Sequence, residues 1–318
     1  MHTCMKKINV AKKRKKISSP DHEKVGTFLL NISMSKLRVA IQGQEGCYHE
    51  WAAKQYFEGE EVEVVCCTTF QAEFDAMAAD PNLLGIVAIE NTIAGNLLQN
   101  HELLRHSQSQ IVGEHRLHIS HVLCALPGTK LSDVIEVNSH PIALRQCEVF
   151  LQTQLPNAKV AEMADTAGSA KIIKEQHLAG HAAVCSEYAA NLYGMEVLAR
   201  GIETNKRNFT RFLILQDKFA QKPLVARQDV NKASIDFCVR HTQGSLTKVL
   251  TILSFYGMNL TKIQSMPIIG REFEYRFFID LTFDDYMQYR KALDAILPFA
   301  TDFQILGEYK ENTEIFNR

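Results

Sequence analysis

The chain has 318 residues and a formal net charge of −1, so it can hold two or three domains, and its charge favours neither a nucleic-acid nor a membrane partner. Its eight cysteines form no CxxC pair and no evenly spaced framework, which predicts reduced thiols, a cytoplasmic location and no metal site. No apolar run approaches the length of a membrane span, and no signal peptide is expected.

Residues 1–35 are predicted to form a disordered tail. They contain the basic cluster KKINVAKKRKK, which lacks apolar periodicity and is followed by the turn-rich SSPD. A nucleic-acid-binding patch is the alternative interpretation of such a cluster. Met34 directly precedes SKLRVAIQG, where ordered sequence is expected to begin, and is a second candidate for the start of translation.

From Lys36 onward, short apolar runs alternate with segments of helical spacing. The strand candidates are LRVAI, VEVVCC, LGIVAI, IVGEHRLHISHVLCAL, VIEV, KVAEM, HAAVC and TRFLIL. The helix candidates between them are HEWAAKQYF, TFQAEFDAMAA, GNLLQNHELLRH, PIALRQCEVFLQTQ and TAGSAKIIKEQ. This alternation predicts an α/β fold with a largely parallel sheet over residues 36–216.

A polar, proline-containing stretch, residues 217–231, is predicted to be a linker. Residues 232–311 then run strand (ASIDFCV), helix (GSLTKVLTILSFY), strand (NLTKIQSM), strand (EYRFFIDL), helix (DDYMQYRKALDAIL) and strand (FQILGEY). This βαββαβ order predicts a ferredoxin-like domain. Gly257 lies where the first helix of that domain should end, which is the usual position of a left-handed cap.

Three loops follow predicted strands and precede predicted helices, where α/β proteins bind their ligands. GQEGCYHEW turns at Gly43 and Gly46, and the turn is either structural or anion-binding. The polar residues of IENTIAGN either cap the next helix or face a ligand. VNSHPIALRQC places Ser139 and His140 at a strand end and Gln146 further along the helix. Each loop alone is a modest signal.

The stretch NFTRFLIL, residues 208–215, begins polar and ends as an apolar run typical of a buried strand. It is entered through Thr210 and Arg211, a hydroxyl and a cation that would be costly to bury unpaired. These two side chains therefore either face water at a strand end or face a group that needs them.

The combination of GQEG, IENT, NSHPIALRQC, SEYAANLYGMEVLARGIETNKRNFTRF and GSLTKVLTILSFYGMNLTKIQSMP resembles the prephenate dehydratase family, from about Lys36 to the C-terminus. The Thr-Arg-Phe triplet at 210–212 is that family's hallmark, and residues 232–311 look like its ACT regulatory domain. The resemblance implies two α/β lobes, similar to type II periplasmic binding proteins, with the active site in the cleft between them. It also implies conversion of prephenate to phenylpyruvate, in phenylalanine biosynthesis, without a cofactor.

By the same resemblance Thr210 is the residue required for catalysis, and we expect it to donate a hydrogen bond to the departing hydroxyl. Glu90, Asn91 and Gln146 are expected to line the cleft as orienting groups. Arg211 either binds a substrate carboxylate or pairs with an acid and braces its loop. The other expected substrate-binding residues are Gly43, Gly46, Thr92, Ser139, Thr166 and Phe212.

Several positions depart from the commoner family pattern. In the first loop, Cys47 replaces a hydroxyl and His49 replaces a serine. A nucleophilic role for Cys47 is not expected, because the implied reaction needs no covalent intermediate. In the C-terminal segment, Gln264 and Met266 stand where glutamate and arginine are usual.

The resemblance also implies a homodimer or homotetramer inhibited by L-phenylalanine, which would bind at Gly244, Ser245, Leu246, Asn259, Leu260, Gln264 and Ser265. Two alternatives to a prephenate dehydratase stay open. An arogenate dehydratase performs the same elimination on the amino acid, and a non-catalytic amino-acid sensor would share the fold. The set Thr210, Glu90, Asn91 and Gln146 favours an enzyme, because ligand sensing does not require it.

Overall fold

A computed structural model describes residues 36–220, 224 and 229–312. The predicted tail, residues 1–35, lies outside the described residues, as do residues 221–223 and 225–228 of the predicted linker. Within the described part of the chain, no helix is long and apolar enough to cross a membrane.

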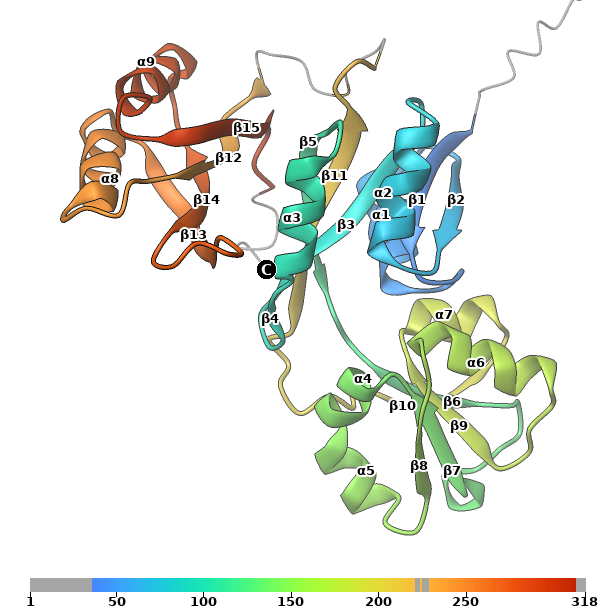
Figure 1. The fold of residues 1–318 in the computed structure, drawn as a ribbon. Coiled ribbons are helices and arrows are strands. Elements are labelled where there is room, and N and C mark those ends of the chain that lie inside the picture. The colour runs from blue at the N-terminus through green and yellow to red at the C-terminus, as the bar shows by residue number, and fades with distance from the viewer. Residues whose placement is uncertain (1–35, 221–223, 225–228, 313–318) are drawn as a thin grey trace, which may run out of the picture. The chain divides into compact units, whose positions relative to one another are not determined.

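The first lobe consists of residues 36–118 and a strand that returns to it later in the chain, β11 (Phe209–Asp217) (Figure 1). Its other elements are β1 (Leu37–Gln42), α1 (Tyr48–Tyr56), β2 (Val62–Cys67), α2 (Phe70–Ala79), β3 (Leu84–Asn91), β4 (Gly95–Asn96), α3 (Leu98–His106) and β5 (Ser109–His118). Helices cover both faces of its sheet. Val39 and Ile41 of β1 share a buried core with α1, while Ala40 shares a second core with α2.

The second lobe, residues 122–200, is continuous in sequence and has its own sheet. Its elements are β6 (Val122–Ala125), a 3-10 turn (Leu131–Asp133), β7 (Glu136–Ser139), α4 (Pro141–Gln146), α5 (Glu148–Gln154), β8 (Lys159–Glu162), α6 (Thr166–Glu175), β9 (His181–Cys185), α7 (Glu187–Leu192) and β10 (Glu196–Arg200). Asp165 caps α6 by accepting a hydrogen bond from the Gly168 N–H at 2.6 Å. The chain crosses between the lobes at residues 119–121 and 201–208.

The C-terminal module, residues 232–309, has the predicted βαββαβ order. Its elements are β12 (Lys232–Cys238), α8 (Ser245–Phe255), β13 (Asn259–Pro267), β14 (Tyr275–Thr282), α9 (Tyr286–Ile296) and β15 (Thr301–Tyr309). Both helices pack on its sheet, with Val249 of α8 and Leu293 of α9 in one core. Gly257 follows α8 with a φ of 75°, so the predicted left-handed cap is confirmed.

The first lobe and the C-terminal module share one sheet. Its strand order is β13-β14-β12-β15-β5-β11-β3-β1-β2, with β4 beside β3, and the second lobe has the order β10-β6-β9-β7-β8. The predicted largely parallel sheet is wrong. β1 is parallel to β2 and β3, but β11 runs antiparallel to both β3 and β5, because the chain leaves the first lobe through β5 and returns through β11.

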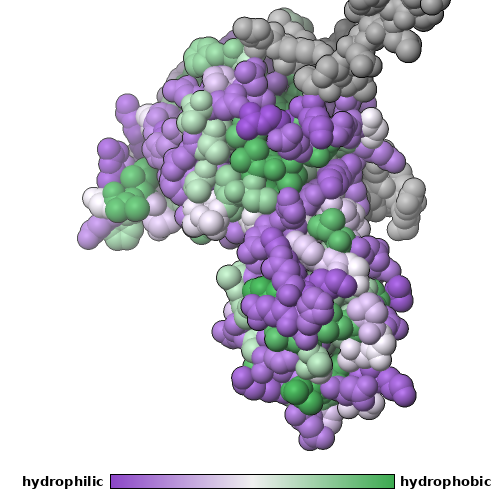
Figure 2. Space-filling model, turned by 90° about the vertical axis from the view of Figure 1, so that its right-hand side faces the viewer, coloured by the Kyte–Doolittle hydropathy of each residue, from purple (hydrophilic) through white to green (hydrophobic). Residues whose placement is uncertain are grey.

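The junction between β15 and β5 joins the C-terminal module to the first lobe. Gly307 pairs with Ile111 across it, and Phe278, Leu306 and Tyr309 of the module share a buried core with Ile111 and Leu213 of the first lobe. Apolar side chains are thus buried on the sheet at this junction, while hydrophilic side chains cover much of the molecular face shown in Figure 2. The junction is therefore a packed interior, and the two parts of the sheet support each other.

Gly307→Ala should destabilise this junction. A Cβ built at Gly307 would lie 2.2 Å from the Ile111 carbonyl oxygen, which is backbone and cannot move aside cheaply. We expect the free energy of unfolding to fall by about 1–3 kcal/mol in urea titrations. The control is Gly168→Ala in α6, where the nearest heavy atom lies at 3.3 Å on the Gln44 side chain. Equal stability of the two variants would contradict a tight β15–β5 contact.

Candidate active site

A cavity of about 700 Å³ lies between the two lobes. First-lobe residues on its wall include Tyr48, Asn91, Thr210 and Phe212, and second-lobe residues include Gln146 and Thr166. Among the predicted residues, the cavity therefore brings together Thr210, Asn91, Gln146, Thr166 and Phe212. Thr210 and Phe212 lie on the same face of β11 because side chains alternate along a strand.

Thr210 is held by Asn91. The two residues are paired across β11 and β3, and Asn91 Nδ2 donates to Thr210 Oγ1 at 3.0 Å. The amide orientation follows from the other end of Asn91, where Oδ1 accepts from the backbone N–H groups of Ile93 at 2.9 Å and Ala94 at 2.8 Å. Among the described residues, the Thr210 hydroxyl has no acceptor for its proton. The hydroxyl proton is therefore available to a bound molecule.

Gln146 is oriented by a neighbour that the sequence analysis missed. Asn91 Nδ2 also donates to Asn208 Oδ1 at 2.8 Å, which leaves Asn208 Nδ2 to donate to Gln146 Oε1 at 3.0 Å. With its oxygen fixed in this way, Gln146 keeps Nε2 as a donor with no partner in the described part of the chain. Asn208 lies two positions before Thr210, so strand alternation was the signal that could have found it.

His121 completes the chain of hydrogen bonds. Its Nε2 lies 2.9 Å from Gln146 Oε1, and its Nδ1 lies 2.9 Å from the Tyr48 hydroxyl. Burial lowers the pKa of His121 below its ordinary value of 6.5, so the ring is neutral at pH 7. Because Gln146 offers an oxygen, the ring carries its proton on Nε2 and Nδ1 is an acceptor. The single proton of the Tyr48 hydroxyl is shared between His121 Nδ1 and the Ser120 carbonyl, which lies 3.0 Å away. Neither His121 nor Tyr48 was predicted from the sequence as a site residue.

No lysine or arginine is among the described residues on the cavity wall. The N-terminal residues Tyr48 of α1, Phe70 of α2 and Thr166 of α6 line it instead, so the positive ends of three helix dipoles lie at the wall. Asp165 also lies on the wall, and burial raises the pKa of its carboxyl. The described residues contain no cluster of three or more potential metal ligands.

Glu90 was predicted to line the cleft, and this prediction is wrong. Glu90 and Arg211 are paired across β3 and β11, one position along from Asn91 and Thr210, so their side chains lie on the opposite face of the sheet. Glu90 there accepts from Lys262 Nζ of β13 at 2.7 Å. Glu90 is therefore not among the described residues on the cavity wall.

Ser139, Thr92 and the first-loop glycines also lie outside the cavity wall. Ser139 is fully buried and donates to the Val184 carbonyl at 2.5 Å, which supports the second-lobe sheet. Thr92 Oγ1 accepts from Phe209 N–H and donates to the Arg207 carbonyl, both at 2.9 Å, and so fastens the lobe crossing. Gly43 and Gly46 have φ values of 120° and 88°, which only glycine adopts readily, and they shape the turn into α1.

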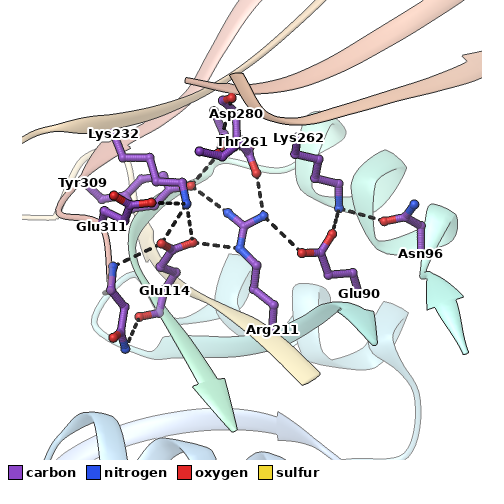
Figure 3. Close-up of polar contacts among 12 residues, drawn as sticks. Glu90, Asn96, Glu114, Arg211, Lys232, Thr261, Lys262, Asp280, Tyr309 and Glu311 are labelled. Carbon is purple, nitrogen blue, oxygen red and sulfur yellow. Dashed lines mark hydrogen bonds and ion pairs between the residues drawn. The ribbon is translucent and has the colours of Figure 1, made fainter. Parts of the chain in front are cut away.

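Two roles were predicted for Arg211, binding a substrate carboxylate or pairing with an acid. In the structure Arg211 pairs with acids (Figure 3). It donates to Glu114 at 2.7 Å, Asp280 at 2.5 Å and the Tyr309 hydroxyl at 3.0 Å, and its side chain is 5% exposed. Lys232 adds a second cation on Glu114 at 2.8 Å. Burial would raise the pKa of Asp280, but the Arg211 guanidinium holds it below its ordinary value. Arg211 thus links the strand of Thr210 to the C-terminal module.

The predicted effector-binding residues lie on two elements of the C-terminal module. Gly244, with a φ of 74°, Ser245 and Leu246 form the start of α8, and Asn259, Leu260, Gln264 and Ser265 lie on β13. Gln264 also contacts the first lobe, because Asn96 Nδ2 of β4 donates to its Oε1 at 2.6 Å. The β13 strand is therefore in direct contact with the loop that follows Asn91.

Comparisons with known proteins agree with this geometry. The sequence model of the prephenate dehydratase family matches residues 39–220. The chain is 36% identical over 293 residues to arogenate dehydratase 1 of Petunia hybrida, covering 86% of this chain and 67% of that protein. Two solved structures are also similar. One is described as the quorum quenching acylase GqqA, with 30% identity and a TM-score of 0.77 over 88% of this chain and 100% of that one.

The second solved structure is prephenate dehydratase from Arthrobacter aurescens in complex with L-Phe, with 26% identity and a TM-score of 0.76 over 86% of this chain and 90% of that one. The matched family segment covers more than half of the chain and includes Asn91, Gln146 and Thr210. The chain belongs to the prephenate dehydratase family.

Proposed function

We propose that the chain is a prephenate dehydratase, which converts prephenate to phenylpyruvate, carbon dioxide and water. The ring carboxylate leaves as carbon dioxide, its bonding pair enters the ring, and the ring hydroxyl departs and takes up a proton as water. Aromatisation of the ring drives these steps, so the protein must hold the dianion and help the hydroxyl leave. The observation that carries the proposal is the Thr210 hydroxyl, whose acceptor side is occupied by Asn91 and whose proton is free.

In this proposal Thr210 donates a hydrogen bond to the departing hydroxyl, because a threonine hydroxyl is too weak an acid to transfer its proton outright. Gln146 Nε2 is a second donor to the substrate. The apolar wall residues Ala88, Ile119 and Phe212 suit the substrate ring, and the helix N-termini suit its carboxylates. Each of these groups binds or orients the substrate without a cofactor.

Arogenate is the second candidate substrate, and Asp165 favours it. Arogenate carries an ammonium group where prephenate carries a ketone, and a carboxylate on a wall without fixed cations would pair with that ammonium. The Petunia relative is named for this substrate. Turnover of both compounds by the purified protein, followed by the appearance of aromatic product, distinguishes the two.

Acyl transfer, the activity in the name of the acylase neighbour, has less support in this cavity. Burial raises the pKa of the Cys47 thiol to about 12, so it is protonated and a poor nucleophile at neutral pH. The hydrogen-bond partner of Thr210 is the Asn91 amide, which cannot take up a proton as a general base.

Thr210→Ala should lower kcat by about 10²–10³-fold, the usual cost of removing one donor to a developing charge. Thr210→Ser should retain part of the activity because it keeps the hydroxyl. Steady-state rates on prephenate and arogenate measure the effect, with unfolding curves to confirm that the variants are folded. Thr247→Ala on α8 is the control, since this hydroxyl lies in the C-terminal module. Wild-type turnover by Thr210→Ala would contradict the assigned role.

We further propose that residues 232–311 form an ACT regulatory domain of a homodimer or homotetramer that binds L-phenylalanine and inhibits the enzyme. The description of the Arthrobacter neighbour as a complex with L-Phe supports this effector. Gly244 and the first turn of α8 offer free backbone N–H groups to an amino-acid carboxylate.

A phenylalanine titration should show saturable binding by calorimetry and a parallel loss of turnover. An effector inhibits only through its different affinity for two states, and about 1.4 kcal/mol of that difference gives tenfold inhibition. L-alanine serves as the control ligand because it lacks the ring. Binding without inhibition would refute coupling to the active site, and no binding at millimolar concentration would refute the effector site.

A further inference from the structure

The two residues that carry the Thr210–Asn91 contact each have a neighbour held by the C-terminal module. Arg211 follows Thr210, and Glu90 precedes Asn91, and both point away from the cavity toward β13, β14 and β15 (Figure 3). Consecutive Cα atoms are about 3.8 Å apart, so a shift of either neighbour moves the cavity residue beside it. Contacts between the module and the face of β3 and β11 opposite the cavity can therefore change the positions of Thr210 and Asn91.

Lys262 is the module's contact with the end of β3. Its Nζ donates to Glu90 Oε2 at 2.7 Å and to Asn96 Oδ1 at 2.8 Å, and so joins the end of β3 to β4. The Lys262 side chain is 9% exposed, against 54% for Lys36 in an ordinary surface pair. Removing one partner of a largely desolvated pair costs more than breaking an exposed pair, because the remaining charge is left uncompensated.

We propose that Lys262 is a positioning residue for catalysis, which acts by holding Glu90 so that Asn91 stays in place to orient the Thr210 hydroxyl. This inference rests on the proposed function. Lys262 does not touch the cavity, so its loss acts on the alignment of the donor with the departing hydroxyl more than on the pockets that bind the substrate. Misplacement by about 1 Å can cost on the order of 10²-fold in rate.

The position of Lys262 gives this contact a further consequence. Lys262 lies on β13, two residues before Gln264, which contacts Asn96. A movement of β13 would therefore reach Asn91 through two contacts, one at Glu90 and one at Asn96. Such a route needs no change in the angle between the lobes.

Lys262→Met tests the proposal because it removes the charge and keeps a long apolar stem. We expect kcat to fall about tenfold or more with KM changed less than about twofold. Lys262→Arg should restore most of the rate, since it keeps the cation. The matched control is Arg271→Met, which breaks the exposed Arg271–Glu274 pair of the same module and should leave kcat unchanged.

A double-mutant cycle ties the effect to Glu90. Glu90→Gln should lower kcat like Lys262→Met, and the double variant should be no slower than the worse single variant, because the Lys262–Glu90 ion pair is lost in each. Additive losses, a wild-type kcat for Lys262→Met, or an equal loss in Arg271→Met would each overturn the proposal.

Hydrogen exchange provides a readout that does not depend on turnover. Peptides covering residues 88–96 and 208–213 should exchange faster in Lys262→Met, while a peptide covering residues 181–190 of the second lobe should not change. Unchanged exchange in the first two peptides would overturn the inference. If the wild-type protein turns over neither prephenate nor arogenate, the proposed function fails, and the exchange data still decide whether Lys262 holds the strands.

Discussion

The buried ion pairs of Arg211 hold β11 to the rest of the protein. A guanidinium taken out of water is tolerated only when its donors are met, and here Glu114, Asp280 and the Tyr309 hydroxyl meet them from three strands. Loss of one partner from such a network typically costs about 3–5 kcal/mol, because a buried charge is left uncompensated. β11 therefore has one energetically acceptable position relative to β5, β14 and β15.

Because β11 is fixed in this way, the residues on its cavity face need only weak hydrogen bonds to stay in place. Thr210, Asn91, Asn208 and Gln146 are neutral, and each hydrogen bond between them contributes only about 0.5–1.5 kcal/mol on its own. Their orientation is nevertheless determined, because the backbone N–H groups of Ile93 and Ala94 fix one end of the chain of amides and neutral His121 fixes the other. The charged residues around Arg211 on one face of the sheet fix the position of β11. The neutral donors on the other face line the cavity.

Periodicity was sufficient for the C-terminal module, where each strand and helix is predicted by local pattern and Gly257 marks a helix end. It was insufficient for the first lobe, because sheet direction depends on where a strand returns. Strand alternation in NFTRF already separates Thr210 from Arg211, and the same rule separates Asn91 from Glu90. Strand alternation could not reveal the ion-pair partners of Arg211 and Glu90, since Asp280 and Lys262 are distant from them in sequence. His121 had no local signal either, because it lay inside the single predicted strand IVGEHRLHISHVLCAL, which the structure divides into β5 and β6.

The place of β11 in the sheet also governs the order in which the chain can fold during synthesis. β11 lies between β5 and β3, yet it is made after the whole second lobe. The second lobe, residues 122–200, can close its own sheet as soon as it leaves the ribosome, whereas β3 and β5 keep unpaired edges until residue 217 has emerged. Open strand edges invite pairing with other chains. The first lobe is therefore the part of the nascent chain most exposed to misassembly. Completion of β11 closes the edges of β3 and β5 that face it, while the other edge of β5 stays open until β15 has been made.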